Sequence, residues 1–218
     1  MKRGRTALAW LQRGLILAGG LPALHMLYRV TLALRPGGPG LGKPVIENVA
    51  QSSGRWALYF LLLSLAITPV RRVFSLHWLV RFRRTLGLLA FFYAGLHAAT
   101  WLLDRGRHSA LSLAQSILSD VAQRPYIALG AAAFFGLVPL AVTSTRAMIR
   151  RLGPAWQRLH RLVYGVSLLA VLHFVWRAEQ DAWSAVLCGM IWLASMALRL
   201  VFWARDVQRA WSEDSDAT

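Results

Sequence analysis

The sequence predicts an all-α membrane protein, a polytopic bundle of six transmembrane helices with both termini in the cytoplasm (N-in/C-in). Three observations predict this fold. First, 56% of the 218 residues are hydrophobic, and the mean hydropathy is +0.45. Second, several apolar runs are long enough to cross hydrocarbon, which takes about 20 helical residues. Third, basic residues gather on alternate connections, which is the pattern that sets membrane orientation.

The apolar runs divide the chain into six spans. The first run follows a basic N-terminus, and its length favours a retained span over a cleaved signal peptide. Pro69 is expected to end or kink the second span. We therefore expect a cytoplasmic N-terminus (1–9), one transmembrane domain (10–203) and a polar cytoplasmic tail (204–218) that ends in a disordered segment, WSEDSDAT. The predicted spans are Trp10–Leu34, Trp56–Val73, Thr85–Leu103, Pro125–Val142, Trp156–Trp176 and Ala182–Trp203.

The formal net charge of +16 follows from this topology rather than from nucleic-acid binding. Lys and Arg concentrate in the N-terminus, the 2–3 and 4–5 connections and the tail, whereas the other connections carry acids such as Glu47 and Asp181. The positive-inside rule then places both termini in the cytoplasm. The basic residues on that side include Lys2, Arg3, Arg5, Arg13, Arg71, Arg72, Arg81, Arg83, Arg84, Arg146, Arg150, Arg151, Arg158, Arg205 and Arg209.

Two connections and one cysteine need separate comment. The Gly/Pro-rich stretch 35–44 predicts a turn on the outer side. The mixed basic and apolar stretch 72–84 predicts a cytoplasmic amphipathic segment in the interface, with a docking surface for an electron donor as a further possibility. Cys188 is the only cysteine, which excludes an intramolecular disulfide, and we expect it to pack as a small hydrophobic residue.

Two of the six histidines lie at matched depth on parallel spans. His97 lies about twelve residues past the start of the third span and His173 a similar distance past the lipid-facing start of the fifth, so their depths agree at 1.5 Å rise per residue. Such a pair is what a b-type haem needs, since each neutral imidazole supplies one axial ligand. The alternative is that each histidine hydrogen-bonds a neighbouring helix.

The other histidines are less well placed. His160 lies about 20 Å below His173 along the helix, so it could ligate a second haem, or it could be an interfacial histidine among arginines. The inner end of the third span offers Arg83 and Arg84 rather than a matching histidine. We expect a structural or quinone-contact role for His25, and we expect His77 to be interfacial and His108 to be solvated in an outer loop.

Several strings resemble the MsrQ family (also called YedZ), the haem-binding membrane subunits of bacterial periplasmic methionine sulfoxide reductase systems. They cover nearly the whole chain from the first span to the last. These strings are GRWALYFLLLSLAITPVRR, RTLGLLAFFYAGLHAATW, RPYIALG and TSTRAMIRRLGPAWQRLHRLVYGVSLLAVLHFVW.

The resemblance implies more than the spacing does. It implies a ferric reductase-like fold in the bacterial inner membrane that binds haem b, as one haem or two, and FMN. It implies electron flow from the quinone pool or a cytoplasmic flavin reductase to MsrP, a periplasmic molybdopterin enzyme that repairs methionine sulfoxide. The chain would then transfer electrons without acting on the sulfoxide itself. The family's haem-ligating histidines fall on His97, His160 and His173.

This sequence departs from the wider superfamily in two respects. NADPH oxidases carry a second histidine in the third span where this chain has arginine, and they carry a cytoplasmic nucleotide domain for which this chain has no room. No motif locates the FMN site. The basic connections could attract its phosphate. Two other functions remain open from the residues alone: a transporter that relays protons through buried histidines, and a membrane anchor without redox activity.

Overall fold

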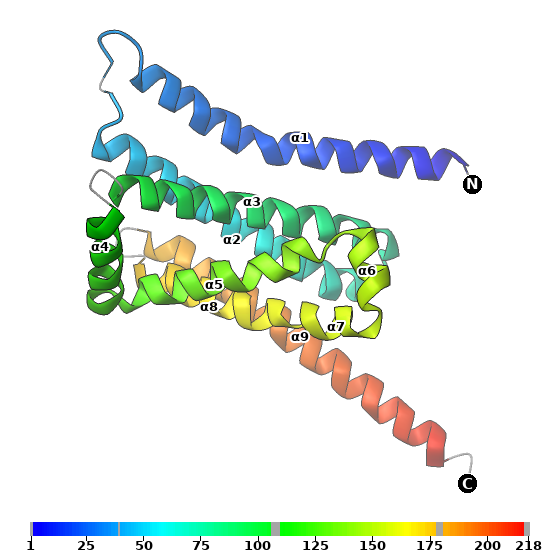
Figure 1. The fold of residues 1–218 in the computed structure, drawn as a ribbon. Helices are drawn as coiled ribbons and strands as arrows, with labels where there is room; N and C mark the ends of the chain where they lie inside the picture. The colour runs from blue at the N-terminus through cyan, green and yellow to red at the C-terminus, as the bar shows by residue number, and fades with distance from the viewer. Residues whose placement is uncertain (1, 39, 106–109, 178–180, 216–218) are drawn as a thin grey trace.

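The computed structural model describes residues 2–38, 40–105, 110–177 and 181–215, and these residues form helices without β-strands. Figure 1 shows the long helices running roughly side by side, with α4 lying across one end of the bundle and α6 at the other. The helices are α1 (Lys2–Ala33), α2 (Lys43–Val73), the short 3₁₀ helix η1 (His77–Leu79), α3 (Val80–Arg105), α4 (Ala110–Gln123), α5 (Pro125–Val142), α6 (Arg146–Leu152), α7 (Pro154–His160), α8 (Leu162–Arg177) and α9 (Ala182–Ser215).

Two helix pairs form the centre of the bundle. α2 packs most extensively against α3, and α5 packs against α8. The first pair meets the second through contacts of α3 with α5 and of α2 with α8, while α9 closes one side against α2 and α8. α1 lies outside this centre and contacts α2 and α3. Within the described residues, six segments are long and apolar enough to span a membrane, which confirms the predicted fold class.

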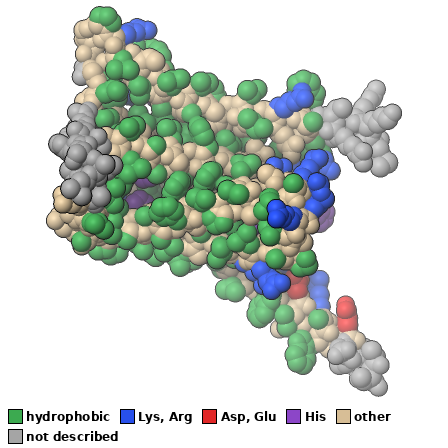
Figure 2. Space-filling view, viewed as in Figure 1, with side chains coloured by type: hydrophobic (Ala, Val, Ile, Leu, Met, Phe, Trp, Pro, Cys, Tyr) green, Lys and Arg blue, Asp and Glu red, His purple; other side chains and the backbone are tan. Residues whose placement is uncertain are grey.

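The two chain ends and most of the basic side chains lie at the same end of the molecule. Figure 1 places both termini at the α6 end, as an even number of spans requires. Figure 2 shows Lys and Arg side chains gathered mainly at that end, whereas hydrophobic side chains cover the long sides of the bundle. Large apolar residues such as Leu17 and Trp183 are more than 70% exposed, as expected for surfaces that face lipid.

Several predicted boundaries were wrong. α2 begins at Lys43 rather than Trp56, because Pro44 suits a helix start. The polar side chain of Ser53 is tolerated inside the helix because its hydroxyl donates to the carbonyls of Val49 and Ala50. The end of α2 at Val73, beyond Pro69, is the one predicted. The described tail is helical to Ser215 rather than disordered, since α9 continues beyond the apolar run. Residues 216–218 lie outside the described residues.

The connections also differ from the prediction. The 72–84 stretch is not one interfacial segment, because η1 is a single 3₁₀ turn and α3 already begins at Val80. The connection between the third and fourth spans contains the helix α4. His108, which was predicted to be solvated in this connection, lies outside the described residues. Gly153 joins α6 to α7 with a φ of +50°, a conformation that favours glycine. Cys188 is buried beside Leu58, Leu62 and Val171, which confirms its expected packing role.

A tyrosine from α3 forms hydrogen bonds with the backbone of α1 next to a proline. Pro22 has no amide hydrogen, and one residue later the Ala23 amide donates to the Tyr93 hydroxyl at 3.0 Å. The same hydroxyl donates to the Gly19 carbonyl at 2.6 Å, so it bridges two backbone groups of α1. Tyr93 is fully buried and stacks on Phe60 of α2. One side chain therefore fixes α1 to the centre of the bundle and satisfies two polar groups at membrane depth.

We expect Tyr93→Phe to lower the free energy of unfolding by about 1–3 kcal/mol, because it leaves a buried amide and carbonyl without their hydroxyl partner. Unfolding of the purified protein by SDS titration in mixed micelles measures this effect. Tyr28→Phe is the matched control, since Tyr28 is 57% exposed on α1. Equal stability of the two variants would show that the hydrogen bonds of the Tyr93 hydroxyl to α1 do not contribute to the free energy of unfolding.

Candidate haem site

The structure brings the rings of His97 and His173 close together between the two central helix pairs. Their ring centroids are 6.1 Å apart and their ring planes are inclined by 70°. His97 lies on α3 and His173 on α8, both toward the α4 end, and both are partly buried. Figure 2 shows histidine side chains, in purple, inside an opening near that end of the bundle. This contact agrees with the matched depth predicted for the two residues, and their role as haem ligands stays a prediction.

Each histidine is held by the same arrangement of residues. His97 Nδ1 lies 2.7 Å from the Ala50 carbonyl oxygen on α2, and His173 Nδ1 lies 2.7 Å from the Tyr126 carbonyl oxygen on α5. In both, the carbonyl precedes the histidine by 47 residues. A carbonyl only accepts, so each Nδ1 must carry the hydrogen and donate it. This fixes the tautomer and leaves Nε2 of each ring with its lone pair available to a metal.

A glycine one turn beyond each carbonyl makes room for the ring. A Cβ added at Gly54 of α2 would lie 3.0 Å from His97 Nδ1, and one added at Gly130 of α5 would lie 2.8 Å from His173 Nδ1 and Cε1. Real Cβ atoms essentially never show the Gly130 distance, and the Gly54 distance is tighter than nine in ten real Cβ contacts, so each imidazole rests directly on a helix backbone. The α2–α3 and α5–α8 pairs thus contribute equivalent halves of one site, although the sequence shows no internal repeat.

The spacing of the pair fits an iron between the rings. A metal–imidazole bond is about 2 Å long, and the ring centre lies roughly 1 Å further, so two opposed ligands have centres roughly 6 Å apart. The observed centroid separation of 6.1 Å matches this geometry. Within the described chain, no three His, Cys, Asp or Glu side chains gather to hold a metal ion. The pair therefore suits a cofactor that brings its own equatorial ligands, as haem does.

His160 lies apart from this pair, at the start of the same span. Its Nδ1 lies 3.2 Å from the carbonyl oxygen of Trp156 on its own helix, and its ring stacks on the Trp156 indole with centroids 3.9 Å apart. Its Nε2 is buried without a hydrogen-bond partner, and no second histidine ring contacts it among the residues described. Thirteen residues before His97, the position equivalent to His160 holds Arg84. The arrangement that builds the His97–His173 pair is therefore not repeated here.

Two other cavities flank the bundle. A cleft of about 550 Å³ between α1 and α2 is lined by polar residues including His25, Asn48 and Ser52, together with apolar residues such as Met26 and Val49. Sequence reasoning did not bring these residues together, because His25 and Asn48 belong to different spans.

His77 is exposed on η1, as expected for an interfacial residue.

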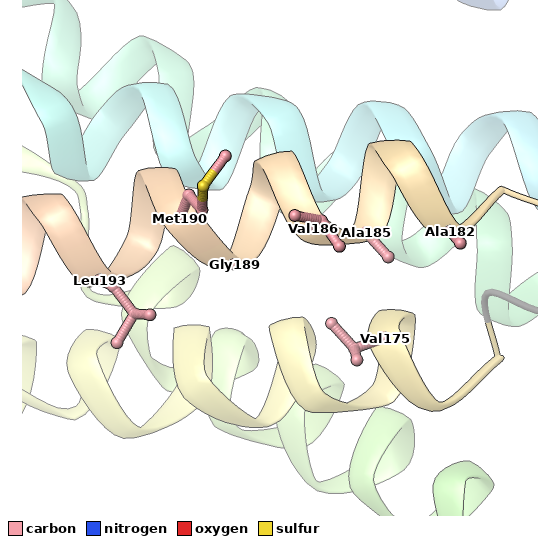
Figure 3. A pocket seen from close by; sticks show the side chains of 7 residues that line it. All are labelled: Val175, Ala182, Ala185, Val186, Gly189, Met190 and Leu193. Carbon is pink, nitrogen blue, oxygen red and sulfur yellow. The ribbon is translucent and has the colours of Figure 1, made fainter.

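The second cavity, of about 310 Å³, lies between α8 and α9 (Figure 3). In Figure 3 the side chains of Val175 and Leu193 point into the space between the two helices. Its lining is entirely apolar or glycine, so it offers no group for acid–base chemistry. The remaining lining residues are Ala182, Ala185, Val186, Gly189 and Met190.

Comparison with known proteins agrees with this geometry. The chain matches the family described as ferric reductase like transmembrane component over residues 53–171, which include both halves of the site except Ala50 and His173. It is 45% identical over 167 residues to the protein-methionine-sulfoxide reductase heme-binding subunit MsrQ of Herminiimonas arsenicoxydans, covering 75% of this chain and 74% of the relative. The chain belongs to the MsrQ family.

Two other MsrQ relatives give the same result. The subunit of Ralstonia nicotianae is 45% identical over 161 residues, which covers 70% of this chain and 72% of the relative. The subunit of Bordetella pertussis is 43% identical over 169 residues, covering 76% of this chain and 80% of the relative. The resemblance found in the sequence is therefore confirmed, and it places the chain among ferric reductase-like membrane proteins.

The close contact between Gly130 and the His173 ring can be tested without a cofactor. We expect Gly130→Ala to lower the free energy of unfolding by about 1–3 kcal/mol, since its methyl group would press into the His173 ring and overpack the contact. Gly165→Ala, on α8, meets no atom within 4 Å and should raise stability by about 0.4–1 kcal/mol, as alanine does in helices. SDS unfolding titrations measure both. Equal effects of the two substitutions would contradict the close backbone–imidazole contact.

Proposed function

We propose that this chain is the haem-binding, electron-transferring membrane subunit of a protein-methionine-sulfoxide reductase system. The observation that carries the proposal is the His97–His173 pair, in which both Nδ1 atoms are occupied by backbone carbonyls and both Nε2 atoms are left for one iron. A b-type haem held there supplies reversible one-electron chemistry. The chain supplies the axial ligands, burial and the surrounding charges.

The names of the relatives support both parts of this function. Each is a heme-binding subunit of a protein-methionine-sulfoxide reductase, so the proposed partner is the catalytic subunit of such a system. We assign the partner as MsrP, a periplasmic molybdopterin enzyme that receives the electrons and repairs oxidised proteins. This chain would not act on the sulfoxide itself. A proton relay is less well supported, because both Nδ1 atoms are fixed by carbonyls that cannot take up a proton.

The membrane orientation follows from charge. The basic α6 end belongs in the cytoplasm by the positive-inside rule, which gives N-in and C-in in the bacterial inner membrane. The α4 end, with the histidine pair near it, then faces the periplasm. A haem at this depth would be close to a periplasmic partner.

Two donors fit this orientation. The quinone pool is supported by the α1–α2 cleft, which lies between two membrane-spanning helices and presents hydrogen-bonding groups at His25, Asn48 and Ser52. α2 separates this cleft from His97, which rests on Gly54 of the same helix. A cytoplasmic flavin reductase would instead approach the basic α6 end. That end also offers arginines, among them Arg71 and Arg158, for the phosphate of FMN.

The ligand assignment can be tested by spectroscopy. We expect the purified chain to give a low-spin b-type reduced-minus-oxidised spectrum, and His97→Ala and His173→Ala each to abolish it, because each removes one axial ligand. His77→Ala is the control and should retain the spectrum. Haem quantified per chain in His160→Ala decides whether His160 holds a second haem. A colourless protein after expression with adequate haem supply, or unchanged spectra in both variants, would contradict the proposal.

The donor can be tested in lipid nanodiscs under anaerobic conditions. If the quinone pool is the donor and the cleft its entry point, a reduced ubiquinone analogue should reduce the haem, and His25→Ala should slow that reduction at least several-fold. Reduction by dithionite should be unaffected, which controls for damage to the haem. Reduction only by NADH with a flavin reductase would assign the donor to the cytoplasmic side.

A further inference from the structure

An ion pair lies one turn beyond the histidine pair, at the α4 end. Arg177 follows His173 by one turn on α8, and Glu47 precedes Ala50, whose carbonyl holds His97, by one turn on α2. Arg177 Nη2 and Glu47 Oε1 are 3.6 Å apart. Since a helical turn rises about 5.4 Å, the pair connects the two halves of the site directly above the imidazoles.

Arg177 lies close to both halves of the site. It is on the same helix as His173, and its ion-pair partner Glu47 is on the helix whose Ala50 carbonyl holds His97. Its side chain is 41% exposed and that of Glu47 is 60% exposed. Ion pairs this exposed contribute little to folding, so the guanidinium can exchange partners at small cost.

A second ion pair nearby provides a contrast. Arg55 of α2 lies 3.4 Å from Asp181, which immediately precedes α9, and both side chains are 40% exposed. Hydrogen bonds from the Ser184 hydroxyl and from Arg55 hold the pKa of Asp181 below its ordinary value, so this carboxylate stays ionised at neutral pH. Arg55 also lines the α1–α2 cleft, on the side of α2 that faces α1. Its charge is therefore matched and directed away from the histidines.

Haem b carries two propionate carboxylates on one edge of its ring. Carboxylates inside a membrane protein need a cation or water, and both histidines lie nearer the α4 end of their helices than the α6 end. We propose that Arg177 anchors a propionate of the haem held by His97 and His173, and that Glu47, by sharing the guanidinium, reduces the positive charge that the haem experiences. This inference rests on the proposed function.

The charges of Arg177 and Glu47 should shift the midpoint potential of the haem in opposite directions. A positive charge near the iron favours the ferrous state over the more positive ferric state, so Arg177 should raise the midpoint potential. Glu47 opposes that effect and should lower the potential. Gln51 donates to Glu47 at 3.2 Å and keeps the carboxylate in place when Arg177 is replaced.

The test is a spectroelectrochemical titration of the full chain in nanodiscs. Arg177→Gln should shift the midpoint potential downward, Glu47→Gln should shift it upward, and Arg55→Gln, the matched control, should leave it at the wild-type value. All three variants should keep the low-spin spectrum, because both axial ligands remain. Arg177→Lys, which keeps the charge, should recover most of the shift.

Opposite shifts for Arg177→Gln and Glu47→Gln with an unmoved control would establish the inference. A wild-type potential in Arg177→Gln, or an equal shift in Arg55→Gln, would overturn it. If Arg177→Gln loses its haem during purification while Arg55→Gln keeps it, the anchoring role is supported, and Glu47→Gln still tests the sign. A wild-type chain without haem would instead refute the proposed function.

Discussion

The hydrogen bonds from two imidazoles to two backbone carbonyls are the interaction on which the rest of the site depends. Each bond fixes a tautomer, aims one nitrogen at the space between the helix pairs, and removes the freedom of the ring to rotate. The bonds can form only if the imidazole lies directly on the neighbouring helix, which requires Gly54 and Gly130 at the point of contact. The close packing of α2 on α3 and of α5 on α8 follows from this requirement.

The two halves of the site are equivalent in geometry but not in sequence. Three positions define each half: a carbonyl, a glycine one turn later, and a histidine on the next helix of the pair. The residues between these positions differ between the two halves. At the α6 end the equivalence is lost, since Arg84 occupies the position on α3 that His160 occupies relative to His173. The two ends of the bundle therefore offer different chemistry.

Several polar groups in the described bundle have partners on other helices, although His160 Nε2 and Arg199 Nε are buried without one. The Tyr93 hydroxyl bonds to two backbone groups of α1 beside Pro22, and Arg199 of α9 donates to the Leu65 carbonyl and to the Tyr164 hydroxyl. The basic residues lie mainly at the α6 end, while ion pairs that include Arg55 and Arg177 cross-link helices at the α4 end. This distribution follows from the cost of leaving polar or charged groups without partners in hydrocarbon.

The sequence by itself determined the six spans, the clustering of charge on alternate connections and the depth of His97 and His173, because hydropathy and helical rise are properties of local sequence. It misplaced the start of α2, since polar residues such as Asn48 and Ser52 lower the hydropathy of a helix that tertiary contacts still support. It also missed α4. Only the tertiary structure decided which carbonyls hold the histidines, why Gly54 and Gly130 matter, and which arginine lies above the pair. Those features join residues from different helices, and no local pattern specifies how helices pack against one another.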